Sequence, residues 1–120
     1  MTRRKQLSAA LLILLLTSCA AVQLHPGSVN KIDSSAYDVL LISQAVIDQS
    51  RAEVAAGKLP DSLKPGLMKL IDAYNIARAS WLTYRNAVKA GQSADAGGMN
   101  RTISILSAAL NAFQSSRAIQ

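Results

Sequence analysis

The most constraining feature of this 120-residue chain is a row of apolar side chains between residues 62 and 90. Its members alternate at spacings of three and four: Leu67, Leu70, Tyr74, Ala77, Trp81, Tyr84 and Val88. This spacing puts them on one face of an α-helix that packs against near-antiparallel neighbours. Ser62 can cap this helix, Pro65 falls in its first turn, and Gly91 ends it. The row predicts a helix over residues 62–90 with Trp81 at the centre of the core.

A second helix is predicted ahead of this one, over residues 33–56. Its large apolar residues recur every seven positions and have further apolar neighbours: Leu40, Leu41, Ile42, Val46, Ile47 and Val54. A helix that is apolar over most of its girth packs on more than one side. Asp33 or Ser34 is expected to cap its start, and Gly57 to follow its last turn.

A third helix is predicted over residues 94–116. Its apolar row is Met99, Ile103, Leu106, Leu110 and Phe113. Ser93 can cap its start, whereas Gly97 and Gly98 weaken its first turns by about 1 kcal/mol each relative to alanine. The row ends near Ser115, where the apolar pattern fades.

Three helices joined by short loops predict an all-α fold, a small up-down-up three-helix bundle over residues 33–118. No alternating apolar run bounded by hairpin turns predicts a strand. The core is expected to be modest, because alanine-rich faces bury little surface per contact. We therefore expect self-association, or a protein partner that covers one face of the bundle.

The first nineteen residues carry a targeting signal. Its parts follow in order: the basic residues Arg3, Arg4 and Lys5, the apolar run 7–16, and the tetrad Leu16, Thr17, Ser18 and Cys19. This order is typical of a secretory signal peptide. The tetrad resembles the lipobox of bacterial lipoproteins, in which the cysteine is diacylated and the signal is cut in front of it. The resemblance implies a signal peptide over residues 1–18 and a covalent lipid, such as palmitate, on Cys19.

An uncleaved membrane span is the alternative interpretation of this stretch. Residues 6–30 contain no Asp, Glu, Lys or Arg. A span needs roughly 20 mostly apolar residues, however, and the strongly apolar part stops at Leu16. On this alternative the protein is an N-terminally anchored structural or membrane-active element, such as a phage or toxin-type lysis protein.

Residues 19–32 are predicted to form a flexible tether that begins at the lipidated cysteine. They show no helical period, and Pro26-Gly27 is a turn signal. The thirteen residues after Cys19 span at most about 45 Å when extended. His25 is the only histidine, and it has no second histidine or free cysteine with which to bind a metal.

Nothing in the chain predicts catalysis. Hydrolytic or transfer chemistry needs a base, a nucleophile or a metal within reach of one another, and the chain has one His, one Cys and one Glu, Glu53. The six aspartates lie at helix starts or on polar faces: Asp33, Asp38, Asp48, Asp61, Asp72 and Asp95. We expect no enzyme, no metal site and no cofactor other than the lipid on Cys19.

Four basic residues fall within about 60° of one another on a helical wheel of the 62–90 helix: Lys64, Arg78, Arg85 and Lys89. They form a candidate ridge for an anionic surface, such as lipid headgroups. The simpler interpretation, which we favour, is that their stems cover the core while the charges stay in water. Tyr74, Trp81 and Tyr84 have the spacing of core residues rather than of a stacking site. No nucleic-acid-reading motif is present, and we expect no nucleic-acid partner.

The Cys-anchored, all-helical, alanine-rich pattern is similar to murein-lipoprotein-type envelope proteins. That family has one uninterrupted helix and a terminal Lys joined to peptidoglycan, neither of which is found here, so wall attachment is not expected. Ala20 stands where an Asp retains enterobacterial lipoproteins at the inner membrane. Together, the lipobox, the helical domain and Ala20 favour a small lipid-anchored periplasmic lipoprotein, at the outer membrane of a Gram-negative bacterium, that acts as a binding or scaffolding module. Without residues 1–18 the chain has ten basic and seven acidic residues, a net charge of only +3.

Overall fold

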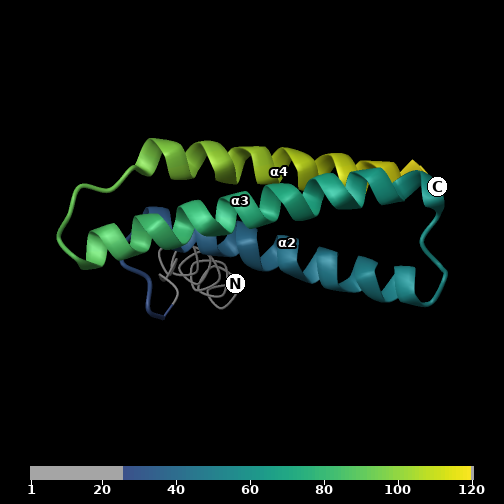
Figure 1. Ribbon diagram of the computed structural model, residues 1–120, viewed down its shortest axis with the longest axis horizontal. Coiled ribbons are helices and arrows are strands. Elements are labelled where there is room, and N and C mark those ends of the chain that lie inside the picture. The colour runs from purple at the N-terminus through teal and green to yellow at the C-terminus, as the bar shows by residue number, and fades with distance from the viewer. Residues whose placement is uncertain (1–25, 120) are drawn as a thin grey trace, which may run out of the picture.

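The computed structural model describes residues 26–119, which form three long helices (Figure 1). Helix α2 covers Lys31–Ala55, a short 3₁₀ turn covers Asp61–Leu63, α3 covers Lys64–Lys89 and α4 covers Ala96–Ile119. The helices lie side by side, with connections at alternate ends (Figure 1). The predicted all-α, up-down-up three-helix fold is confirmed for this part of the chain, which contains no strand. The predicted signal peptide, the lipobox and the first part of the tether lie outside the described residues.

Helix α2 begins two residues earlier than predicted. Asn30 has an extended backbone, and its side chain accepts a hydrogen bond of 2.9 Å from the N–H of Asp33. The carboxylate of Asp33 reaches back and accepts one of 2.8 Å from the N–H of Val29. Asn30 is therefore the cap, and the two expected caps, Asp33 and Ser34, are buried in the first turn.

Helices α2 and α3 both end at a glycine, as predicted. Gly57 and Gly91 each have φ +67°, in the left-handed region that residues with a Cβ avoid. The next residues, Lys58 and Gln92, donate backbone hydrogen bonds of 2.8 and 2.9 Å to carbonyls of the last turn. This is the Schellman arrangement, which satisfies the helix end and turns the chain back.

Helix α4 is capped by Asp95 rather than by Ser93. The Oδ1 atom of Asp95 accepts a hydrogen bond of 2.8 Å from the N–H of Gly98. A Cβ atom at Gly98 would collide with the same carboxylate. The glycine that was expected only to weaken this helix therefore also leaves room for its cap.

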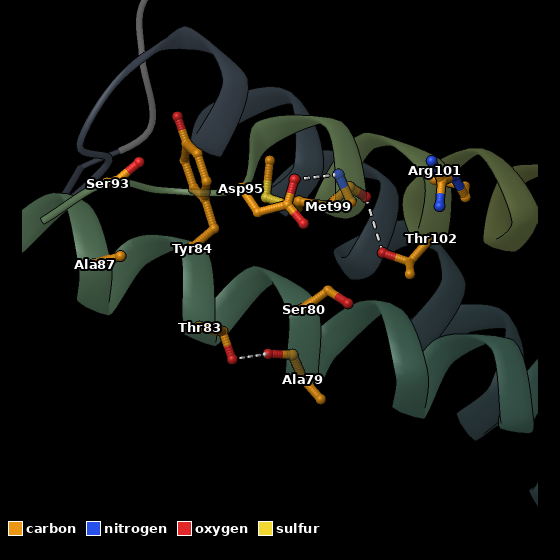
Figure 2. Close-up of a pocket in the computed structure, with 11 residues that line it drawn as sticks. Ala79, Ser80, Thr83, Tyr84, Ala87, Ser93, Asp95, Met99, Arg101 and Thr102 are labelled. Atoms are coloured by element: carbon orange, nitrogen blue, oxygen red, sulfur yellow. Dashed lines mark hydrogen bonds between the residues drawn. The ribbon is translucent and has the colours of Figure 1, made fainter.

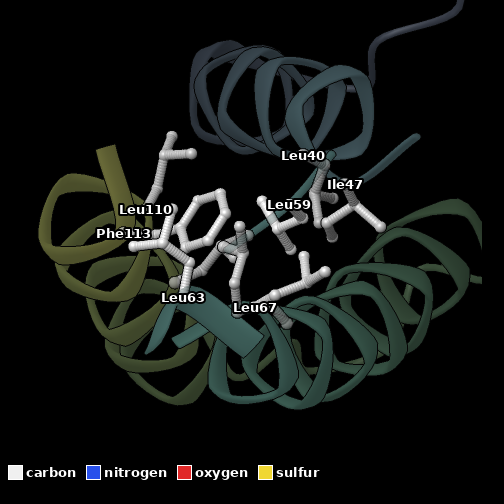
Figure 3. Close-up of a cluster of buried hydrophobic side chains, with 10 residues drawn as sticks. Leu40, Ile47, Leu59, Leu63, Leu67, Leu110 and Phe113 are labelled. Carbon is white, nitrogen blue, oxygen red and sulfur yellow. The ribbon is translucent and has the colours of Figure 1, made fainter. Parts of the chain in front are cut away.

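The main core cluster lies where all three helices meet (Figure 3). Its buried members are Leu40, Ile47, Leu59, Leu63, Leu67, Leu70, Ala77, Leu106, Leu110 and Phe113. A smaller cluster of Ala36, Tyr84 and Met99 lies nearer the α3–α4 loop. Trp81 packs against both clusters but is only partly buried, so its prediction as the centre of the core is wrong. The largest fully buried apolar side chains are instead Phe113, Leu70, Met99 and Leu106.

The inner face of α2 alternates large and small residues. Ala36, Ser43 and Ser50 are buried beside Leu40 and Ile47. The Oγ atom of Ser43 has no hydrogen-bond partner among the described residues. Small side chains thus occupy part of the inner face of α2, and the buried apolar surface of this helix is narrower than predicted.

Three apolar residues of the predicted α2 surface are exposed: Val54, from the row that recurs every seven positions, and Leu41 and Ile42, which are predicted to widen it. Leu41 is 49%, Ile42 55% and Val54 41% exposed. Their positions turn them away from the face that α2 presents to its neighbours. The prediction that these residues are buried is therefore wrong, whereas it holds for Leu40 and Ile47.

Candidate functional site

A buried carboxylate joins the start of α2 to the second half of α3. Asp33 is 1% exposed. Its Oδ1 atom accepts a hydrogen bond of 2.5 Å from Nε1 of Trp81, and its Oδ2 atom lies 3.3 Å from Nε of Arg85. We call Asn30, Asp33, Trp81, Tyr84 and Arg85 the Asp33 cluster. The sequence pattern predicts that Trp81 faces the core and that the charge of Arg85 faces the solvent, yet both residues belong to this cluster.

The groups around Asp33 offset the free-energy cost of burying its charge. A carboxylate removed from water is costly unless hydrogen-bond donors and a positive charge face it. Asp33 has two N–H donors, from Val29 and Trp81, and the guanidinium of Arg85. The guanidinium also lies over the Trp81 ring, 5.0 Å from its centroid. The side chain of Arg85 is only 20% exposed, so this arginine belongs to the packed structure.

The same cluster fixes residues 27–30, which we call the strap. Nη2 of Arg85 donates a hydrogen bond of 2.7 Å to the carbonyl of Gly27. Nδ2 of Asn30 donates one of 2.8 Å to the hydroxyl of Tyr84, and Val29 packs on the smaller core cluster. The strap is thus part of the folded domain, although the sequence pattern predicts a flexible tether through residue 32.

A groove of about 540 Å³ runs between α3 and α4 beside their loop (Figure 2). Most of its lining residues are small or bear a hydroxyl, and Met99, Asp95 and Arg101 complete the lining. The hydroxyls of Thr83 and Thr102 donate to carbonyls of their own helices, at 3.0 and 2.8 Å, and are therefore already engaged.

The four residues of the predicted basic ridge have different surroundings. Lys64 pairs with the exposed Asp61 at 2.7 Å, and the hydrogen bond and charge of Lys64 lower the pKa of that carboxyl. Arg85 is held in the Asp33 cluster, whereas Arg78 and Lys89 are exposed. The ridge is therefore interrupted at Arg85, and contact of these residues with an anionic surface stays a prediction.

The only glutamate of the chain is used in an ion pair far from the Asp33 cluster. Glu53 accepts a hydrogen bond of 2.6 Å from Nη2 of Arg117, whose Nη1 lies 3.3 Å from Oγ of Ser50. The guanidinium of Arg117 is 5.8 Å from the centroid of the Phe113 ring. These contacts give the last turn of α4 partners on α2 and explain why α4 continues to Ile119, beyond the predicted end at residue 116.

Residues 26–119 offer no group of three or more His, Cys, Asp and Glu side chains that could hold a metal ion. Within the same residues, no helix has the length and apolarity needed to cross a membrane. Cys19 and the rest of the lipobox lie outside the described residues. Comparison with protein-family models, with curated proteins and with solved structures finds no match to this chain.

Proposed function

We propose that this protein is a small lipid-anchored helical module of a bacterial cell envelope, held to the membrane by an acyl chain on Cys19. The tetrad of residues 16–19 supplies the anchor by its resemblance to a lipobox. This resemblance carries the proposal, and the strap is compatible with it because it gives the domain a fixed point of attachment to the chain that leads from residue 19. A domain on a lipid anchor needs such a point if the membrane is to set its position.

The strap shortens the distance between the lipid and the folded domain. Seven chain steps separate Cys19 from Pro26, the first described residue, and they reach at most about 25 Å. The predicted tether, with its reach of about 45 Å, included the strap and the start of α2. The proposed anchor therefore keeps one end of the bundle close to the bilayer.

The use of the acidic residues supports a binding or scaffolding role rather than catalysis. Asp33 and Glu53 are engaged in partly buried ion pairs, and Asp95 caps α4. Asp61 pairs with Lys64 on the surface. The groove between α3 and α4 is then the described feature best suited to a partner, because its small side chains allow close approach of another helix.

Acyl labelling tests the anchor. Cells expressing the protein are fed a palmitate analogue, with and without an inhibitor of the lipoprotein signal peptidase. Labelled mature protein is expected without the inhibitor, labelled precursor with it, and no label in Cys19→Ser. The alternative, an uncleaved N-terminal span, predicts an unlabelled full-length chain that does not respond to the inhibitor.

A second substitution tests the proposed location at the outer membrane. Ala20→Asp introduces the residue that retains enterobacterial lipoproteins at the inner membrane, so it should move the labelled protein from the outer- to the inner-membrane fraction. Ala21→Asp, one position further, is the matched control and should leave the distribution unchanged. An equal distribution of all three proteins would contradict the outer-membrane part of the proposal.

A further inference from the structure

We propose that the end of the bundle that carries the strap rests on anionic phospholipid headgroups, which contact Lys31 and Lys89. This inference rests on the proposed function, because it requires the lipid on Cys19. It goes beyond that function in naming the surface of the domain that meets the membrane and the headgroup charge that this surface selects.

The two lysines lie at the same end of the molecule. Lys31 is the first residue of α2 and Lys89 the last of α3. Their sequence neighbours, Val29 and Val88, both pack against the smaller core cluster. Both lysines are exposed, and neither forms an ion pair with a carboxylate of the described chain. Ile32, beside Lys31, is 39% exposed and adds an apolar side chain to this end.

The nearest carboxylates at this end already have structural partners. Asp33 is buried against Trp81 and Arg85, and Asp95 accepts the N–H of Gly98 at the start of α4. The charge of Asp33 is thus paired within the fold, whereas Asp95 stays exposed with only a backbone N–H as its partner. Neither lysine has a carboxylate partner among the described residues, and an anionic surface supplies the opposite charge to both.

The geometry of the attachment favours contact of this end of the bundle, rather than the other end, with the bilayer. The tether between Cys19 and Pro26 reaches at most about 25 Å, and the helices of 24 to 26 residues are about 36–39 Å long. The strap is bonded to Tyr84 and Arg85, in the last third of α3. The α3–α4 loop can therefore touch the bilayer while the α2–α3 loop stays about a helix length away.

The size of the effect follows from the number of charges. Each Lys near an anionic membrane surface favours contact by roughly fivefold, so the two together favour it by roughly thirtyfold. Added salt should reduce this preference, because the charges act across water within a Debye length.

A single fluorescent probe on the complete lipidated protein can measure the contact. Cys19 is the only cysteine and carries the lipid, so an introduced cysteine is the only free thiol. Gln92→Cys puts a polarity-sensitive dye on the α3–α4 loop, and Gln114→Cys puts it on the exposed face near the other end of the bundle. The proteins are reconstituted in vesicles of phosphatidylglycerol and phosphatidylethanolamine, or of phosphatidylcholine alone.

The dye at residue 92 is expected to shift to the blue on the anionic vesicles only, and the dye at residue 114 on neither. The double substitution Lys31→Gln and Lys89→Gln should lower the ratio of contacting to free protein by roughly thirtyfold. Lys58→Gln with Lys69→Gln removes the same charge elsewhere and should leave the shift intact.

Failure of this inference differs from failure of the lipid anchor. The mass of each purified protein shows first whether Cys19 is acylated, and an unacylated protein contradicts the proposed function. An acylated protein whose residue-92 dye stays in water on anionic vesicles overturns the contact and leaves the anchor standing. Equal blue shifts on both kinds of vesicle also overturn it, because the contact would not depend on headgroup charge. Loss of the shift in the Lys58→Gln and Lys69→Gln control overturns it too, because the contact would not depend on Lys31 and Lys89 in particular.

Discussion

Replacement of Asp33 by alanine should strongly destabilise the domain. The change leaves the guanidinium of Arg85 without its counter-charge and the N–H groups of Val29 and Trp81 without an acceptor. Removal of one partner of a buried ion pair costs about 3–5 kcal/mol. The Arg85 side chain is 20% exposed and water compensates part of the loss, so we expect about 3 kcal/mol, the lower end of that range.

The loss should be visible in thermal unfolding followed by circular dichroism. For a domain of about 100 residues, 1 kcal/mol corresponds to roughly 4–8 °C, so Asp33→Ala should lower the Tm by about 12–24 °C. Asp72→Ala removes an exposed aspartate of α3 and should stay within about 0.5 kcal/mol of the wild type. A double variant, Asp33→Leu with Arg85→Met, should recover part of the stability, since it leaves no buried charge unpaired.

Amide hydrogen exchange separates release of the strap from a general loss of stability. The N–H of Val29 donates to Asp33 and should be protected in the wild type. In Asp33→Ala at a temperature where α3 is still fully protected, the Val29 amide should exchange quickly. A Tm within a few degrees of the wild type, together with unchanged Val29 protection, would refute the role given to this carboxylate.

Three further predictions concern single positions. Gly98→Ala should raise the free energy of unfolding by no more than a small part of the roughly 1 kcal/mol that alanine normally adds to a helix, because it displaces the Asp95 cap. A gain of the full amount, measured by chemical denaturation, would contradict the cap. Gly91→Ala should cost about 1–2 kcal/mol, because its φ of +67° is strained for alanine, and an unchanged Tm would contradict the Schellman end. Lys64→Ala should raise the pKa of Asp61, followed by NMR titration, toward its ordinary value of 3.8. The pair stabilises the fold above that pH and loses its effect as the pH falls through the lowered pKa, so a pKa unaffected by Lys64→Ala would contradict the interaction.

The features that depend on near neighbours in the sequence were predictable. The row on α3 identifies Leu67, Leu70 and Ala77 as buried, because a spacing of three and four residues follows the turn of a helix. The helix ends at Gly57 and Gly91 follow from the conformational freedom of glycine alone. Both kinds of signal span only a few residues.

The Asp33 cluster could not be predicted in this way. Asp33 and Trp81 are 48 positions apart, and no local pattern pairs them. Arg85 has the spacing of a surface residue on its own helix, yet the strap and the start of α2 cover it. Trp81 lies at the edge of the core because its indole N–H finds an acceptor there, a requirement that apolar spacing does not express.

Helix α2 shows a second limit of pattern reasoning. Large apolar residues dominate an apolar pattern, so the sequence predicts that Leu41 and Ile42 are buried. The buried positions instead include Ser43 and Ser50, which permit close helix packing but contribute little to an apolar pattern. The predicted buried face of α2 is thus correct at Leu40 and Ile47 but extends too far around the helix.

The mass of the intact protein extracted from its own membranes tests the central claim most directly. The lipid-anchor account predicts a chain that begins at Cys19 and carries the mass of a diacylglycerol on that residue. A chain that still contains residues 1–18, or that begins elsewhere with an unmodified thiol at Cys19, would contradict it.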